Sequence, residues 1–447
     1  MRFGQCHSPR SPTCIRQAVS SRHAATNCLA DVMFDEAEST VSLHKPLSGI
    51  PVSLKDCVDI AGHDTTLGYS VNVNRPARSS APIVRLLHDA GALVHVKTSV
   101  PTGLLSFECS SDLFGVTTNP HNPDFSPGAS TGGGAALLVY QGSMVEIGTD
   151  LGGSTRYPAA YCGLYAVKGS MGRFPGLIPP TPACTRALRE VVDALRSQGF
   201  EVIDFHPPSP VELLKIGYQL MFSDGGACVT DPLRTFESIS PAIRTVRFML
   251  RLPLFEKKLA AMLLRWFSRP LGRNDAWAGL FEVLHSKSAA EERRLIVQRE
   301  EHKAAWHAAM REQGLDFILT VPHALPPVPK EKTASNRATL VSANYAFLYN
   351  ILDYSAGVQP VTFVDEAVDR YPPDYKQRAA YQNMNDVARG VHDLYDAKAM
   401  HGLPLAVQVV GGWLQEEKVL EGMKLVEQAL WRQVRDSFHG DFDNSHV

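Results

Sequence analysis

Residues 128–159 read GASTGGGAALLVYQGSMVEIGTDLGGSTRYPA, and two serines in this segment, Ser130 and Ser154, lie in glycine-rich turns. A lysine, Lys55, lies far upstream in the short segment SLKDC. A serine hydroxyl becomes a good nucleophile when a neighbouring base accepts its proton, and a neutral lysine can be that base. The combination therefore predicts an enzyme that transfers acyl groups.

The context of Lys55 favours this interpretation. It lies between the apolar runs GIPVSL and VDIAG, and burial among apolar residues lowers the pKa of a lysine because it disfavours the ammonium form. The second serine can relay a proton between the lysine and the nucleophile. Glycines beside the nucleophile let backbone N–H groups approach a developing oxyanion. The run 151–154 offers such donors.

The segment GASTGGG, followed by GTDLGGSTRYPAAYCGLYAVKGSMGR, resembles the amidase signature family, whose members hydrolyse carboxylic amides. The resemblance implies that Ser154 is the nucleophile, that Ser130 is a bridging serine after a cis peptide bond, and that Lys55 is the base. It also implies an oxyanion hole formed by the peptide N–H groups of Leu151, Gly152, Gly153 and Ser154.

Further segments resemble the fatty acid amide hydrolase branch of that family, in order along the chain: 107–123, 222–226, 315–322, 344–362 and 402–411. The resemblance implies an α/β fold in which a mixed β-sheet core is covered by helices on both faces. It favours a small-molecule substrate that is a fatty acyl amide. Short-chain amides stay open, because the sequence does not show the depth of an acyl channel.

Hydrophobic spacing independently indicates helix-to-strand units. Apolar residues at helical spacing over 83–90 end at Gly91 and precede the strand-like run ALVHVK. The same order returns with a helix through 191–195, then Gly199, then the predicted strand FEVIDF at 200–205. Repeated units of this kind favour a sheet covered by helices.

One alternative for the first serine turn is the nucleophile elbow of the α/β-hydrolases, because GASTG fits the pattern G-x-S-x-G. That motif needs a strand immediately before the turn. The preceding residues, TTNPHNPDFSP, indicate a loop instead. Asp150 and Arg156 are interpreted as a structural ion pair and are left outside the predicted catalytic set.

Composition fits an ordinary enzyme with a large core: 447 residues, 44% of them hydrophobic. We expect a single amidase domain over 1–447, with a catalytic core at about 46–180. A net charge of −2 gives no general attraction to nucleic acid. Eight cysteines without C-x-x-C spacing favour reduced thiols and a cytoplasmic location. No metal-binding motif or phosphate loop occurs in the sequence, and no cofactor is expected.

Residues 241–273, PAIRTVRFMLRLPLFEKKLAAMLLRWFSRPLGR, combine eight basic residues with a single acid and many large apolar ones. Such a segment can lie in a membrane interface, and the resemblance implies a helical cap on the bilayer surface at this place. The alternative is a helix pair packed on the core, with arginines extending to water. No run reaches the length of a membrane-spanning helix, so membrane contact is expected to be peripheral.

The resemblance is interrupted near 176–183, where several dozen residues of the family are absent, including a predicted sheet strand. A deletion inside a sheet leaves unpaired backbone groups. A noncatalytic amidase-fold protein that binds membranes or partners therefore stays a second hypothesis. A third is the amide-transferring subunit of a glutamine-dependent amidotransferase. The sequence leaves a homodimer open.

Overall fold

The computed structural model describes residues 12–39, 45–169, 178–238, 240–268, 275–330 and 342–443. They group into two compact units. The first consists of the described residues of Met1–Asp150, Ala227–Arg247 and Pro327–Asn336. The second consists of those of Leu151–Gly226, Phe248–Pro326 and Arg337–Val447. The single domain expected over 1–447 stays a prediction.

The first unit contains a mixed four-stranded sheet of order β1-β3-β2-β6. Its strands are β1 (Leu29–Val32), β2 (Pro51–Lys55), β3 (Leu93–Thr98) and β6 (Val145–Ile147). Strand β1 runs antiparallel to β3, whereas β2 runs parallel to both β3 and β6. Strands β4 (Ser110–Ser111) and β5 (Gly115–Val116) form a small separate ladder.

Helices lie on both faces of this sheet. The helical elements of the first unit are α1 (Pro12–Thr26), α2 (Phe34–Ser39), α3 (Pro82–Asp89), α4 (Gly132–Val139), α8 (Ala227–Thr230), and the 3-10 turns η1 (Ser70–Asn72) and η2 (Thr102–Leu104). Helix α3 buries Val84 and Leu87 against Leu54 of β2. Helices α1 and α4 pack on the opposite face, around Val96 of β3. The helix predicted over 83–90 and the strand after Gly91 are therefore confirmed.

The second unit contains an antiparallel sheet of order β7-β10-β11-β9. Its strands are β7 (Ala166–Lys168), β9 (Ile318–Thr320), β10 (Ala356–Phe363) and β11 (Pro404–Val410). Its helices are α5 (Arg156–Cys162), α6 (Pro182–Ser197), α7 (Pro210–Met221), α10 (Leu254–Ser268), α11 (Asp275–Val283), α12 (Ala289–Glu312), α15 (Asn344–Ile351), α16 (Ala379–Gln382), α17 (Asp386–Asp393) and α18 (Glu416–Asp443), with η3 (Tyr375–Gln377). Helix α9 (Pro241–Arg251) contains residues of both units.

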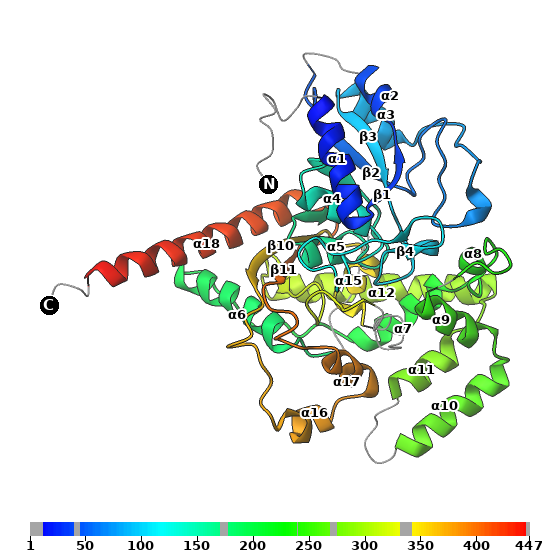
Figure 1. Ribbon diagram of the computed structural model, residues 1–447. Helices are drawn as coiled ribbons and strands as arrows, with labels where there is room; N and C mark the ends of the chain where they lie inside the picture. The colour runs from blue at the N-terminus through cyan, green and yellow to red at the C-terminus, as the bar shows by residue number, and fades with distance from the viewer. Residues whose placement is uncertain are drawn as a thin grey trace. The chain divides into compact units, whose positions relative to one another are not determined.

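Helices cover both faces of the second sheet as well. Helices α6 and α18, the latter the long red helix of Figure 1, pack on Val407 and Val409 of β11. Gln408, which points to the opposite face, accepts a hydrogen bond from Arg156 of α5 and donates one to the Tyr345 carbonyl oxygen of α15. The predicted α/β class and mixed sheet are confirmed, although the described strands form two main sheets and only the first is mixed.

The strand predicted at 200–205 was wrong. The helix before it is confirmed as α6, but residues 200–205 form no ladder with another described strand. Phe200 and Ile203 are 42% and 44% exposed, whereas Val202 packs at the edge of the core. An apolar run alone does not make a strand, because each strand also needs a neighbour for its backbone hydrogen bonds.

Candidate active site

Lys55 is the last residue of β2, and its side chain is completely buried in the first unit. Its Nζ lies 2.8 Å from Ser130 Oγ, 3.0 Å from Thr149 Oγ1 and 3.1 Å from the Thr149 carbonyl oxygen. Burial lowers the pKa of Lys55. In its neutral form the amine can accept the hydroxyl hydrogen of Ser130 while donating its own two hydrogens to Thr149.

Ser130 is held between a loop and a helix. Residues 126–129 form a loop, and the Ala129–Ser130 peptide bond is cis, as the resemblance implied. The absence of a strand over these described residues removes the support for a nucleophile elbow. Helix α4 begins two residues later with three glycines, and a Cβ on Gly133 would lie 2.5 Å from the Cys28 carbonyl oxygen. Glycine thus permits the close packing that fixes the position of Ser130.

Residues 151–154 form a turn that leads into α5, within the second unit. Gly153 has φ +112°, and a Cβ there would lie 2.2 Å from the ring of Tyr157. Ser154 is half-buried and follows this glycine directly. The turn therefore has a backbone conformation and a close packing at Gly153 that only glycine accepts readily, and the oxyanion hole over 151–154 stays a prediction.

Arg156 has a structural position behind that turn. Its side chain is fully buried and donates hydrogen bonds to Gln408 of β11 and Asn350 of α15, both 2.7 Å long. The guanidinium thus connects α5 to the sheet and to a second helix. This position supports leaving it outside the catalytic set.

The sequence did not single out His323, which is buried beneath α5. Its Nδ1 lies 3.0 Å from the Tyr161 hydroxyl, and its Nε2 lies 2.9 Å from Ser342 Oγ. Its ring also contacts the edge of Tyr157, which packs on Gly153. Burial lowers the pKa of His323 to about 4, so this group is neutral at physiological pH.

The sequence also did not indicate three residues that surround Lys55, namely Thr149, Thr98 and Glu146. Thr149 is the threonine of the segment GTD, and its proximity to the glycine turns was the available signal. Thr98 and Glu146 gave no local signal in the sequence. They lie on β3 and β6, and only the register in which these strands pair with β2 brings them near Lys55.

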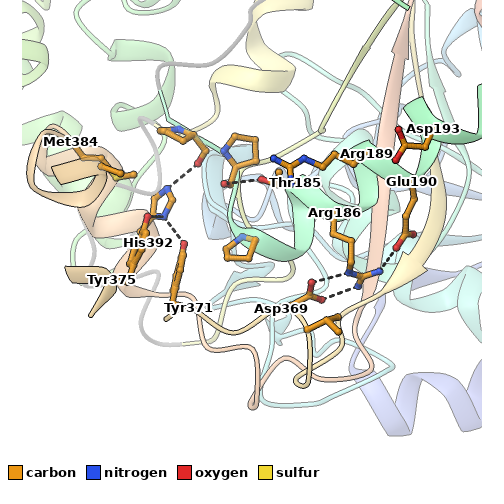
Figure 2. A pocket seen from close by; sticks show the side chains of 15 residues that line it. Thr185, Arg186, Arg189, Glu190, Asp193, Asp369, Tyr371, Tyr375, Met384 and His392 are labelled. Carbon is orange, nitrogen blue, oxygen red and sulfur yellow. Dashed lines mark hydrogen bonds and ion pairs between the residues drawn. The ribbon is translucent and has the colours of Figure 1, made fainter. Parts of the chain in front are cut away.

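A cavity of about 700 Å³ lies elsewhere in the second unit, between α6 and α17 (Figure 2). Tyr371 and Tyr375 direct their hydroxyl groups at Nδ1 of His392, whose Nε2 donates to the Pro179 carbonyl oxygen at 2.9 Å. Arg186 in its wall already binds two carboxylates. None of the predicted catalytic residues lines this cavity, so it is not part of the candidate active site.

The predicted cap consists of helices α9 and α10; residues 269–273 lie outside the described ones. Its exposed large apolar side chains are Phe248, Leu254, Phe255, Leu259, Met262, Leu263 and Trp266. Of the basic residues, Arg244, Arg251, Lys258 and Arg265 are exposed. Lys257 is not among the exposed cations: it is 1% exposed and donates hydrogen bonds to the carbonyl groups of Leu250 and Leu284 near two helix ends.

No described helix is both long enough and apolar enough to cross a bilayer. Among the same residues, no group of three or more histidine, cysteine or carboxylate side chains is arranged to hold a metal ion. The thiol groups of Cys28, Cys57, Cys109, Cys162, Cys184 and Cys228 form no disulfide bonds.

The fold is shared with enzymes that act on amides. A solved structure of a fatty acid amide hydrolase matches with a TM-score of 0.77 at 21% identity, over 94% of this chain and 81% of that one. A family model described as Amidase matches residues 14–177 and 176–420. The chain therefore belongs to the amidase family, and it is an amide hydrolase.

Two relatives show how close the relationship is. Fatty-acid amide hydrolase 1 of Sus scrofa is 32% identical over 486 aligned positions, which cover 91% of this chain and 80% of that protein. Amidase 1 of Gibberella moniliformis is 29% identical, over 91% of this chain and 87% of the relative. The 486 aligned positions exceed the 447 residues of the chain, so the alignment contains gaps in this chain. The family model also breaks into two stretches at 176–177, beside the predicted deletion, which stays a prediction.

Proposed function

We propose that this amidase works through a covalent acyl-enzyme on Ser154, with Ser130 and Lys55 as the proton relay. The observation that carries the proposal is the buried contact of 2.8 Å between Lys55 Nζ and Ser130 Oγ. Burial away from water favours the neutral amine of lysine, and the neutral amine is the form that can serve as a base near neutral pH.

In the first half of the reaction, Ser154 Oγ attacks the carbonyl carbon of the amide and its proton passes to Ser130. Ser130 gives its own proton to neutral Lys55, which becomes an ammonium. The negative charge on the substrate oxygen is held by the peptide N–H groups of 151–154. When the C–N bond breaks, the proton returns through Ser130 to the leaving amine, and water then releases the acid from Ser154.

We further propose that the acyl group is a fatty acyl chain. The support is the 32% identity to the Sus scrofa fatty-acid amide hydrolase, together with the exposed apolar face of α10. An enzyme whose substrate dissolves in membranes benefits from a surface that binds peripherally to them. Lys258, which is exposed on the same helix, would bind lipid phosphates.

A short-chain amidase is the second candidate. It is favoured by relatives named acetamidase, from Aspergillus oryzae at 26% identity and from Emericella nidulans at 24%. Comparing hydrolysis rates for acetamide and for a primary amide of a long-chain fatty acid distinguishes the two candidates.

The mechanism is tested with a fluorophosphonate probe, which reacts with activated serines. We expect wild type to be labelled at Ser154, and Ser154→Ala to remain unlabelled while still folded. Labelling that persists unchanged in Ser154→Ala would remove the proposed nucleophile. A folded wild-type protein that is never labelled would favour the noncatalytic hypothesis, and labelling that requires an added partner subunit would favour the amidotransferase.

A further inference from the structure

One face of the first sheet places a buried carboxyl group beside Lys55. In the parallel ladders, Ser53 of β2 is the register partner of Glu146 on β6, and Lys55 is the partner of Thr98 on β3. Alternate residues of a strand share a face, so Ser53, Lys55 and their two partners lie on one side of the sheet. Thr98 Oγ1 donates to Glu146 Oε1 at 2.7 Å, across β2. The carboxyl group therefore lies over the strand that ends in Lys55.

Helix α4 closes the space above this carboxyl group. A Cβ on Gly134 would lie 2.3 Å from Glu146 Cδ and 2.4 Å from Oε1, so the helix backbone rests directly on the group. Oε2 is buried and has no hydrogen-bond partner among the described residues. Burial raises the pKa of Glu146 to about 7, although the hydroxyl groups of Ser53 and Thr98 and the charge of Lys55 favour its ionised form.

Other groups act on Lys55 as well. Cys57 follows β2, Asp150 follows Thr149, and Cys109 lies before β4. In falling order of effect, the negative forms of Cys57, Asp150, Glu146 and Cys109 oppose the effect of burial on the pKa of Lys55. Of the two carboxyl groups in this set, Glu146 is the one enclosed between the sheet and a helix. Cys28, a buried thiol, also faces Glu146.

We propose that Glu146 is a positioning residue that sets the charge state of Lys55. Its carboxylate keeps Lys55 protonated to a higher pH than burial alone would, so the enzyme gains its working base as the pH rises. The consequence for catalysis rests on the proposed function, in which neutral Lys55 accepts the proton of Ser130. Because the pKa of Glu146 is about 7, its carboxylate exerts this effect on Lys55 at neutral pH and above.

The test measures the titration of Lys55 itself. The protein is labelled with 13C at the lysine ε-carbon, and the Lys55 signal is assigned by its loss in Lys55→Met. In Glu146→Gln, which keeps the size and the acceptor for Thr98, we expect the midpoint of Lys55 to fall by about one pH unit, as for a unit charge at close range in a protein interior. The exposed Glu201→Gln serves as the matched control and should leave the midpoint unchanged.

The second variant, Glu146→Met, removes both the charge and the acceptor at similar length. The proposal predicts the same downward shift in both variants, and the pH at which Ser154 labelling reaches half its maximal rate should fall with it. An unchanged or raised Lys55 midpoint in folded Glu146→Gln overturns the proposal. A lowered midpoint in a protein whose Ser154 is never labelled would support the charge coupling and overturn the proposed function instead.

Discussion

Replacing Gly153 by alanine is expected to damage the turn that carries Ser154, whereas the same change at Gly152 is expected to be mild. At Gly153 the new Cβ would lie 2.2 Å and 2.5 Å from two ring atoms of Tyr157, and 2.7 Å from Ala346 Cβ. The ring cannot easily move away, because it is buried and its hydroxyl donates to the Ala343 carbonyl oxygen at 2.7 Å.

The magnitude follows from two costs. An alanine at φ +112° costs roughly 1–3 kcal/mol in backbone strain, and overpacking of a buried site costs roughly 1–3 kcal/mol more. The free energy of unfolding of Gly153→Ala should therefore fall by about 2–6 kcal/mol. At Gly152 the nearest atom to a new Cβ is Phe347 Cδ2 at 3.5 Å, an ordinary contact, so the change should stay within about 1 kcal/mol.

The assay is urea unfolding followed by circular dichroism, together with the rate of fluorophosphonate labelling. Gly314→Ala is the matched control, since Gly314 has φ +63° and no atom within 4 Å of a new Cβ, and it isolates the backbone cost. Gly153→Ala should lose more stability than this control and should label at least ten times more slowly than wild type. Equal stabilities for Gly153→Ala and Gly152→Ala would refute the reasoning.

Three further predictions concern charge and the cap. Burial lowers the pKa of Lys55, so between that pKa and the ordinary value near 10.5 the unfolded chain binds more protons than the folded one. The free energy of unfolding, measured with urea, should therefore rise with pH in this window. Lys55→Met should abolish that part of the rise. His323 has a pKa of about 4 in the folded protein instead of the ordinary 6.5, so roughly 3 kcal/mol of the free energy of unfolding should be lost as the pH falls from 6.5 to 4. In His323→Gln the free energy of unfolding should depend less steeply on pH in this range. An unchanged slope would contradict the pKa assigned to His323. Trp266→Glu should weaken binding to anionic lipid vesicles at least tenfold in a sedimentation assay. Trp431→Glu is the control and should not weaken it, because Trp431 lies outside the cap although its side chain is 70% exposed, against 72% for Trp266. Equal effects of the two changes would contradict a membrane-binding cap.

Local sequence signals were sufficient for the elements that carry the predicted catalytic residues. The apolar runs around Lys55 predicted its burial, and the strand β2 is buried throughout. The glycines of the two serine turns indicated a backbone that other groups approach closely. At Gly133 and Gly153 neighbouring atoms leave no room for a Cβ. In each case the feature depends on residues adjacent in the chain, and composition and spacing record such features directly.

Features that depend on distant pairing could not be predicted in this way. Glu146 approaches Lys55 through the register of a parallel ladder, and a strand sequence does not specify its register. The run 200–205 has the composition of a strand but lacks a described neighbour to pair with. The sequence does not show that Lys257 is buried, because its burial depends on where two other helices end.

The most direct test of the proposed mechanism is to trap the acyl-enzyme. The protein is mixed with a long-chain fatty acid amide, quenched in acid within the first turnover, digested and analysed by mass spectrometry. We expect the acyl group on the peptide that contains Ser154 in wild type, and a much smaller amount in Lys55→Met. An acyl group on Ser130, or release of the fatty acid without any acylated serine, would contradict the account.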